Sequence, residues 1–342
     1  MTRIVASAPG KLVLLGEYAV LEGAPALVLA VDRRAQVTLT TIDGDAWHVV
    51  SPTLGLETRL RVAADGIAWI ADPPPQLAWL ASLFARLPWL QHLPACRVEL
   101  ASDHFHFDHA GARVKLGLGS SAALTVALLG ALHALAGKPA PSLTECVDCH
   151  RTIQHGRGSG IDVAASLAGG LSRFQLDANQ APRIEPLALP NGLHWCCVFS
   201  GKPASTESML ATVAAWHERN PDGYGRRMHD LATISSRGVD AVAHSDAAAF
   251  LSSLHDYAQT LAGLGEASGA DIASPAHRAI AAIARDCGCV YKSCGAGGGD
   301  VGITFAVDDV RLREFEARAR RGGFPVIELE TDPQGLAIAS TV

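Results

Sequence analysis

The stretch KLGLGSSAALTVAL, residues 115–128, constrains this chain most, because it places two glycines and two serines directly before a long apolar run. The run Ala122–Ala136 has the composition of a buried helix, which Gly137 and Pro139 end. Glycines let a backbone approach a ligand closely, and a helix that opens just after them points free N–H groups at an anion. The stretch therefore predicts a phosphate-binding site. The alternative is an ordinary helix start with Gly and Ser residues.

Composition excludes several classes of protein. The 342 residues are 49% hydrophobic, enough for real cores, so the eight cysteines need not act as disulfide staples. Their spacing does not resemble a secreted framework, and we expect a reducing, cytoplasmic location. A net charge of −6 without a basic run gives no sign of a nucleic-acid partner. The longest apolar run is too short to span a bilayer, so we expect no membrane partner. The sequence leaves the oligomeric state, monomer or homodimer, open.

The cysteine spacing also gives little support to a metal site. Cys146-x-x-Cys149 lies on an expected helix, next to His150. A structural zinc site needs a second ligand pair at suitable spacing, and Cys287-x-Cys289 does not provide it. We therefore interpret these cysteines as core residues.

Short apolar runs separated by turn residues begin the chain. Four strands are expected in the first forty-one residues: Arg3–Ala6, Leu12–Leu15, Ala26–Val31 and Gln36–Thr41. Gln76–Leu87 is expected to form a helix after the break DPPP at 72–75. Ser142–Gln154 is expected to form another, with Ser142 as its N-cap and Glu145 completing a capping box.

A segment rich in proline and asparagine, 181–192, predicts a domain boundary. We divide the chain into an N-terminal domain, 1–185, and a C-terminal domain, 186–342. The second part alternates strands and helices and ends with an expected strand near Pro325–Leu329. This order is typical of an open-faced α+β sandwich.

Two further glycine clusters carry chemistry-bearing residues. GRGSGIDVAAS, residues 156–166, places Asp162 at the start of a short helix, where the helix dipole alone would also favour a carboxylate. KSCGAGGGDVGITF, residues 292–305, is too rich in glycine for a simple turn. Neither is a Walker A loop. Gly117-x-Gly119-x-x-Ala122 loosely fits a dinucleotide fingerprint, but no βαβ unit surrounds it, so a dehydrogenase is a distant alternative.

Taken together and in order, three motifs resemble the GHMP kinase superfamily of small-molecule kinases. They are APGKLVLLGEYAVLEG (8–23), KLGLGSSAA (115–123) and SCGAGGGDVGI (293–303). The resemblance implies an α+β fold, with an N-terminal domain like ribosomal protein S5 domain 2, a C-terminal ferredoxin-like α/β sandwich, and ATP between them. Lys115, Asp300 and the segments 150–166 and 200–210 resemble phosphomevalonate kinases within the superfamily.

One departure concerns magnesium. Mevalonate kinases usually place a glutamate, thought to bind Mg²⁺, eleven residues before the catalytic aspartate, and this chain has Arg151 there. The resemblance therefore leaves Ser121 as the expected protein ligand of Mg²⁺.

The resemblance also implies roles for individual residues. Asp162 matches the family's catalytic aspartate, and Lys11 matches the lysine that would keep this carboxylate ionised. Glu17 receives no role. The expected ATP-binding residues are Lys115, Gly117, Leu118, Gly119, Ser120, Ser121 and Ala122.

Cationic side chains gather in the sequence just before Asp162. If His150, Arg151, His155 and Arg157 converge with Lys202, they form a pocket for an acceptor that already carries a phosphate or carboxylate. The alternative is an exposed, charged helix face. The expected substrate-binding residues are His150, Arg151, Arg157, Ser159, Gly160, Lys202, Ser205, Thr206, Gly297, Gly298 and Asp300.

These residues together predict an ATP-dependent phosphotransferase with a small anionic substrate. The acceptor favoured by the resemblance is 5-phosphomevalonate, which would become 5-diphosphomevalonate. Two alternatives stay open: mevalonate kinase or another family member with an alcohol acceptor, and a non-catalytic sensor of ATP and ligand on the same fold.

Overall fold

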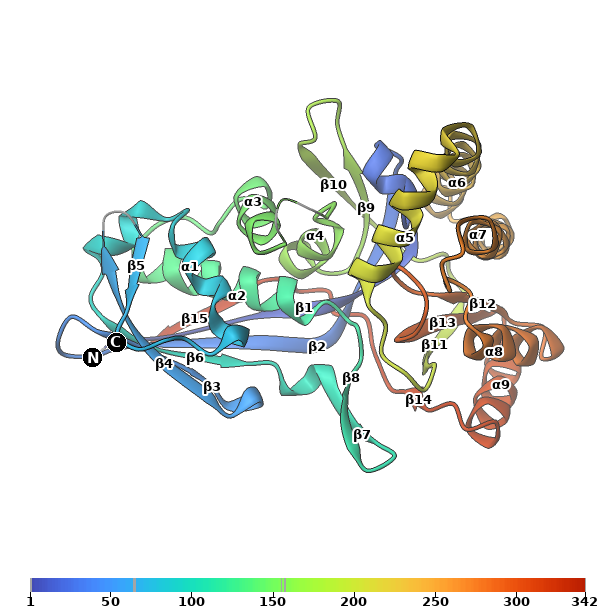
Figure 1. Ribbon diagram of the computed structural model, residues 1–342. Coiled ribbons are helices and arrows are strands. Elements are labelled where there is room, and N and C mark those ends of the chain that lie inside the picture. The colour runs from blue at the N-terminus through green and yellow to red at the C-terminus, as the bar shows by residue number, and fades with distance from the viewer. Residues whose placement is uncertain (1, 64–65, 155, 157, 342) are drawn as a thin grey trace.

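The computed structural model describes residues 2–63, 66–154, 156 and 158–341. Within them, most of the helices pack around two β-sheets (Figure 1). The larger sheet has nine strands in the described chain, with the order β10-β9-β2-β6-β3-β4-β5, and β1 pairs with both β2 and β15. Its strands are β1 (Arg3–Leu15), β2 (Ala26–Thr41), β3 (Trp47–Ser51), β4 (Leu56–Ala63), β5 (Gly66–Trp69), β6 (Cys96–Ala101), β9 (Leu171–Leu176), β10 (Pro182–Leu187) and β15 (Ala337–Thr341).

The first two strands are longer than the sequence predicts. The four short strands expected in residues 3–41 are two continuous ones, β1 and β2, paired along almost their whole length. The division was wrong because a register shift at Pro9/Gly10 interrupts the apolar alternation without ending the strand. Proline is tolerated in a strand at such a bulge. In Figure 1 the two strands run from near both termini to the opposite part of the molecule.

Four helices belong to the part of the chain that forms this sheet: α1 (Trp79–Phe84), α2 (Ser120–Leu135), α3 (Leu143–Ile153) and α4 (Ile161–Ala168). Helix α2 packs on β1 and β2 and is buried along most of its length. It begins at Ser120, so both serines lie in its first turn. The Ser142 cap is confirmed, since its hydroxyl accepts the Glu145 N–H at 3.2 Å. The helix expected at 76–87 was too long: a 3-10 turn precedes α1, which ends at Phe84.

The second sheet is antiparallel, with the order β12-β13-β11-β14, and helices α8 and α9 pack against it to form an α/β sandwich. Its strands are β11 (His194–Phe199), β12 (Val290–Ser293), β13 (Val301–Ala306) and β14 (Val326–Ile327). The helices of this half are α5 (Thr206–Arg219), α6 (Pro221–Ala243), α7 (Ala247–Ser268), α8 (Pro275–Asp286) and α9 (Asp309–Arg321). A separate hairpin joins β7 (His106–His109) to β8 (Ala112–Lys115).

Two further observations bear on the expectations from composition. Among the helices that the structure describes, none has both the length and the apolar character to cross a membrane. All eight cysteines are buried and unpaired, as a core role requires. The cytoplasmic location itself stays a prediction.

The end of the chain returns to the first sheet. After β14, the segment 330–332 bonds to β2 through Asp32 N–H and Ala30 O, and β15 then pairs with β1. Arg34 anchors this return, because its guanidinium pairs with Asp332 and donates to Ser7 O at 2.8 Å. A boundary near residue 185 stays our proposal, and under it the final strand completes the sheet of the N-terminal domain.

Arg34→Met should lower the free energy of unfolding by about 2 kcal/mol, because it leaves several buried acceptors without their donor. Urea denaturation measures the loss. Arg313→Met is the matched control: Arg313 forms an exposed pair with Asp309 on α9, so its loss should leave the midpoint unchanged. Equal midpoints for the two variants would contradict the anchoring role of Arg34.

Candidate active site

Strand β1 passes directly against the first glycine loop. The Lys11 N–H donates to Leu118 O at 2.9 Å, so the strand and the loop 117–119 share a backbone hydrogen bond. A Cβ built on Gly10 would lie only 2.8 Å from Leu118 O. The glycine before Lys11 is therefore required for this close approach.

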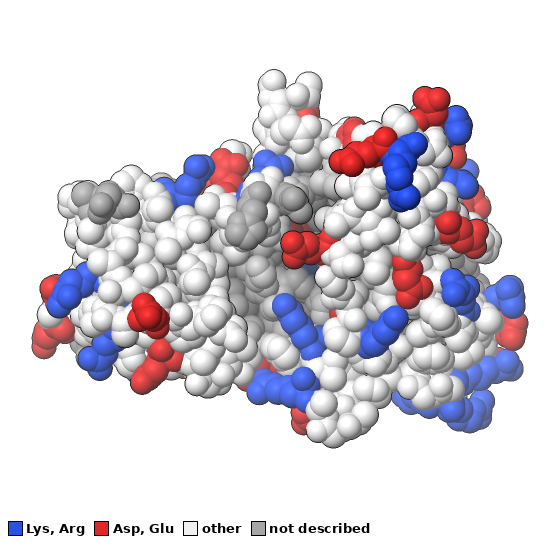
Figure 2. Space-filling view, in the orientation of Figure 1, with Lys and Arg blue, Asp and Glu red and all other residues white. Residues whose placement is uncertain are grey.

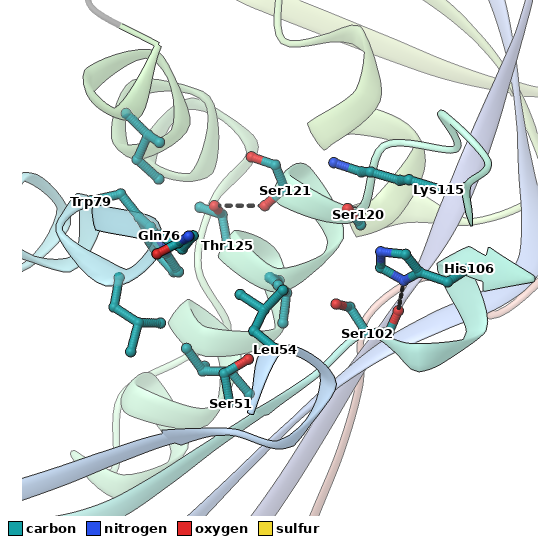
Figure 3. Close-up of a pocket in the computed structure, with 14 residues that line it drawn as sticks. Ser51, Leu54, Gln76, Trp79, Ser102, His106, Lys115, Ser120, Ser121 and Thr125 are labelled. Atoms are coloured by element: carbon teal, nitrogen blue, oxygen red, sulfur yellow. Dashed lines mark hydrogen bonds between the residues drawn. The ribbon is translucent and has the colours of Figure 1, made fainter. Parts of the chain in front are cut away.

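The loop leads into the N-terminus of α2. Gly119 caps the helix in the left-handed region, with φ 80°, and the first N–H groups of α2 have no partner within the helix. Ser121 Oγ lies 3.0 Å from His150 Nε2, which fixes the hydroxyl from the side of α3. In Figure 3, Lys115 reaches from β8 toward Ser120 and Ser121. This arrangement of N–H groups, hydroxyls and a cation suits an anion of high charge.

A cavity of about 300 Å³, the α2 pocket, opens at this helix N-terminus (Figure 3). Lys115, Ser120 and Ser121 line one part of it. The rest mixes polar side chains with apolar ones, and its apolar part includes Leu54 and Trp79, which come from separate segments before the motif. Sequence reasoning missed this apolar part, because no motif links residues so far apart in the chain. The pocket suits a ligand with an anionic end and a flat, apolar end.

Asp162 reaches the same loop from the other side. Helix α4 packs on β1, and Ser166 Oγ donates to Pro9 O at 2.8 Å. A Cβ built on Gly119 would lie 3.2 Å from Lys11 Cε and 3.6 Å from Asp162 Cβ. The structure thus brings the two predicted catalytic residues together at Gly119. They form no ion pair within 4.0 Å in the described structure, so the predicted charge partnership stays a prediction.

A second cavity, the Lys11 pocket, has a volume of about 220 Å³. Lys11 and Asp162 line it together with five other polar residues: Glu17, Tyr18, Gln154, Ser159 and Thr206. Gly295 and Ala296 of the third motif complete its wall. Lys11 is the one cation among the described lining residues. Figure 2 shows the surface hollowed between the two parts of the molecule, with charged side chains at its rim.

Asp300 connects three of the predicted motifs. A Cβ on Gly117 would lie 2.3 Å from Asp300 Cγ, so the carboxyl group occupies the space that a side chain there would need. Asp300 Oδ1 accepts the Ala204 N–H at 3.0 Å, just before α5. Burial raises the pKa of the Asp300 carboxyl, while the Ala204 N–H and the charges of Lys11 and Lys115 oppose the rise. Asp300 therefore lies against the first glycine loop rather than in the Lys11 pocket.

Several predicted substrate residues have other partners. Arg151 donates to the carbonyls of Gly158 and Ser159, at 3.2 and 3.3 Å, and so braces the loop before α4. His150 is buried behind Ser121 and lines neither pocket. Lys202 is half-exposed and pairs with Asp271 at 3.4 Å. The convergence of these three side chains on the Lys11 pocket is not seen.

The remaining candidates have mainly backbone roles or cannot be placed. Gly160 caps α4, and Ser205 caps α5 by accepting the Ser208 N–H at 3.3 Å. A Cβ on Gly297 or Gly298 would collide with Ile272 or Met209, so these glycines allow the third loop to pack closely. Leu118 and Ala122 are buried. The expectations for His155 and Arg157 lie outside the described residues.

Gly117→Ala should destabilise the protein by about 1–3 kcal/mol more than Gly111→Ala. Both glycines have positive φ, 70° and 78°, so both variants carry a similar backbone strain. Only the Gly117 variant meets a neighbour, because no described residue lies within 4 Å of a Cβ on Gly111. Urea denaturation of the two variants measures the difference, and equal losses would contradict the contact with Asp300.

The third loop is also held from behind by His277. Its Nε2 bonds to Gly299 O at 2.9 Å and its Nδ1 to the Tyr291 hydroxyl at 2.7 Å. Burial lowers the pKa of His277 from 6.5 to about 4. The unfolded chain therefore takes up this proton near pH 6.5 and the folded chain only near pH 4, so folding stability falls as the pH falls through this window.

This stability should fall by about 3 kcal/mol more in the wild type than in His277→Gln between pH 7.5 and pH 4, because glutamine does not titrate. Denaturation curves at several pH values measure the two slopes, and other acidic groups cancel in their difference. Parallel pH profiles would show that His277 is protonated equally in both states.

Comparison with known proteins identifies the family of this chain. Residues 92–170 match the family model described as the GHMP kinases N-terminal domain. A Streptomyces sp. (strain CL190) protein named phosphomevalonate kinase is 31% identical, over 88% of this chain and 89% of its own. A Methanothermobacter thermautotrophicus protein named mevalonate kinase is 33% identical over 68% of each chain.

A solved structure shows the same fold. Streptococcus pneumoniae phosphomevalonate kinase, in complex with phosphomevalonate and AMPPNP, matches with a TM-score of 0.77 at 20% identity, over 96% of this chain and 99% of its own. This likeness agrees with the fold that the three motifs imply. With a relative of 31% identity along nearly the whole chain, it leads to one conclusion: the chain belongs to the GHMP kinase family of phosphotransferases.

Proposed function

We propose that this chain transfers the γ-phosphoryl group of ATP to 5-phosphomevalonate, giving 5-diphosphomevalonate and ADP. The observation that carries the proposal is the meeting of Lys11 and Asp162 at Gly119, between the α2 pocket and the Lys11 pocket. A phosphoryl group held at the helix N-terminus would lie beside both side chains. Phosphoryl transfer needs mainly such positioning and charge neutralisation.

ATP fits the α2 pocket by its chemistry. The phosphates would take the free N–H groups of the first turn of α2, the hydroxyls of Ser120 and Ser121, and the charge of Lys115. The base would lie against the apolar part, beside Leu54 and Trp79. We therefore assign the phosphates to the motif and the base to residues that the motif does not contain.

Magnesium fits the same place with few protein ligands. No group of three or more His, Cys, Asp or Glu side chains in the described chain could hold a metal ion. Mg²⁺ usually takes most of its ligands from water and phosphate oxygens, so one hydroxyl can suffice as its protein ligand. Ser121 Oγ, held by His150, is the oxygen that we assign to it. Bound there, the ion would neutralise charge on the β- and γ-phosphates.

The acceptor would enter the Lys11 pocket. Two observations favour a phosphorylated acceptor: the relative that aligns over 88% of this chain is named phosphomevalonate kinase, and Arg151 stands where mevalonate kinases usually have a glutamate. A phosphate monoester has a second pKa of about 6 and is largely ionised at neutral pH. The acceptor phosphate would then carry few protons for Asp162 to remove, and the Asp162 carboxylate would orient Lys11 or the acceptor.

Mevalonate is the second candidate acceptor. Lys11 is the one cation among the described residues of its pocket, which suits a substrate with a single carboxylate as well as a phosphate. The Methanothermobacter relative named mevalonate kinase supports this candidate too.

A coupled assay of ADP release with MgATP distinguishes these functions. The panel is mevalonate, 5-phosphomevalonate, homoserine and galactose. We expect turnover on 5-phosphomevalonate alone. Turnover on mevalonate instead would overturn the proposed acceptor and keep the kinase. ATP binding without turnover on any of the four would contradict the proposed reaction and favour another acceptor or a non-catalytic sensor.

Asp162→Asn should lower kcat on the phosphorylated acceptor by less than about 100-fold, because an ionised acceptor leaves Asp162 no proton to remove. Loss of a general base typically costs about two to four decades. Steady-state kinetics with both substrates saturating measure the effect, with circular dichroism to check the fold. Lys11→Met should cost at least as much, since it removes the charge that faces the transferred group. A loss of four decades or more for Asp162→Asn would mean that this carboxylate removes a proton.

A further inference from the structure

Glu17 forms a buried ion pair across the two halves of the molecule. It lies after β1, and Lys292 of β12 donates from Nζ to its Oε1. The Lys292 and Glu17 side chains are 0% and 4% exposed, so the pair is shielded from water. The Tyr257 hydroxyl holds the Glu17 carbonyl at 2.7 Å. Burial raises the pKa of the Glu17 carboxyl, and Lys292 opposes the rise.

The same carboxylate holds the start of the third glycine loop. The Gly295 N–H donates to Glu17 Oε1 at 3.2 Å, and Lys292 Nζ also donates to Ser293 O at 2.6 Å. The next residue of the first motif, Tyr18, donates from its hydroxyl to Ala296 O at 2.7 Å. Two consecutive residues of the first motif therefore hold two consecutive residues of the third.

Tyr18 adopts a rare backbone conformation. Its φ is 63° and its ψ is −57°, a combination with positive φ that bulky residues avoid. Such strain is kept only where the surrounding structure determines it, and it occurs most often at functional sites. The chain thus holds Tyr18 in an unfavourable conformation while its hydroxyl bonds to Ala296 O.

Packing alone does not account for the ion pair. A buried pair loses much of its attraction to desolvation, and apolar side chains of similar volume are often equally stabilising. One oxygen of this carboxylate, Glu17 Oε2, is buried and has no hydrogen-bond partner among the residues that the structure describes. Gly295 and Ala296, which the pair and Tyr18 hold, line the Lys11 pocket. Burying the ion pair therefore costs free energy, and the contacts of the pair and of Tyr18 converge on the wall of the proposed acceptor pocket.

We propose that Glu17, Lys292 and Tyr18 form a positioning clamp, which fixes the Gly295–Ala296 backbone as the wall of the acceptor pocket. The inference rests on the proposed function in one respect, the identity of that pocket. Glu17 and Tyr18 also line the Lys11 pocket themselves. The clamp acts through the loop that it holds and takes no part in bond making. It gives Glu17, which sequence analysis left without a role, a place in the site.

A set of three variants separates positioning from stability. Glu17→Gln and Lys292→Met each leave one partner buried alone, and each should lower the melting temperature by about 5–10 °C. The double variant Glu17→Gln/Lys292→Met removes both charges, and should melt within about 3 °C of the wild type. If the pair positions the loop, the double variant still shows kcat lowered tenfold or more, with KM for ATP within twofold. A double variant with wild-type melting and wild-type kcat would overturn the proposal.

Tyr18→Phe tests the second contact with a matched control. It removes only the hydroxyl that holds Ala296 O. Tyr224→Phe removes a hydrogen bond of similar length, 2.8 Å, to Glu22 outside the Lys11 pocket. Tyr18→Phe should raise KM for the acceptor or lower kcat at least fivefold, and Tyr224→Phe should change neither by more than twofold. Equal effects of the two changes would contradict a clamp at the pocket.

Hydrogen–deuterium exchange gives a readout that needs no substrate. In the ligand-free double variant, peptides covering 294–300 should exchange at least tenfold faster than in the wild type, while peptides from α2 stay unchanged. Unchanged exchange at 294–300 overturns the clamp whatever the acceptor proves to be. Faster exchange in a protein that turns over no substrate of the panel would overturn the proposed function and leave the clamp intact.

Discussion

Close approach of three chain segments at Gly117 and Gly119 is the constraint on which the rest of the structure depends. Asp300 occupies the space beside one glycine, and Lys11 and Asp162 occupy the space beside the other. A side chain at either position would separate the helix N-terminus from the residues that must face it. The long strand β1 makes this approach possible, because it carries Lys11 under the loop and continues toward Glu17 and Tyr18 at the other half of the molecule.

The third glycine loop has polar supports on several sides. Glu17 and Lys292 hold its start, Asp300 joins its end to the first loop and to Ala204, and His277 bonds to it from behind. A glycine-rich loop has much conformational freedom to lose, and apolar packing gives it few side chains to use. Buried hydrogen bonds to its backbone fix it in one conformation instead. Charged groups at low exposure are thus concentrated where the third loop borders the Lys11 pocket and the first glycine loop.

Much of the fold and part of the site could be predicted from the sequence. The glycine-serine stretch indicated the start of α2, and the resemblance of three motifs brought Lys11 and Asp162 into one site. The apolar part of the α2 pocket could not be predicted, since Leu54 and Trp79 meet only after the strands pair.

The cation cluster before Asp162 predicts a substrate pocket. The spacing of these residues along the chain, however, does not determine where their side chains point. In the structure, Arg151 faces backbone carbonyls and His150 faces Ser121. Glu17 had no recognisable role, because its partner Lys292 lies 275 residues away in the chain. The contacts that could not be predicted are therefore those set by tertiary structure, and a substrate-binding role for these cationic side chains stays a prediction.

The most direct test of the proposed reaction is to identify the bond that the enzyme forms. Phosphorus NMR of the products, after incubation with MgATP and either 5-phosphomevalonate or mevalonate, distinguishes a new diphosphate from a new monoester. We expect a pair of coupled resonances from a diphosphate ester, formed with ADP in equal amount and only from 5-phosphomevalonate. A single monoester resonance from mevalonate, with no product from 5-phosphomevalonate, would contradict the proposed reaction.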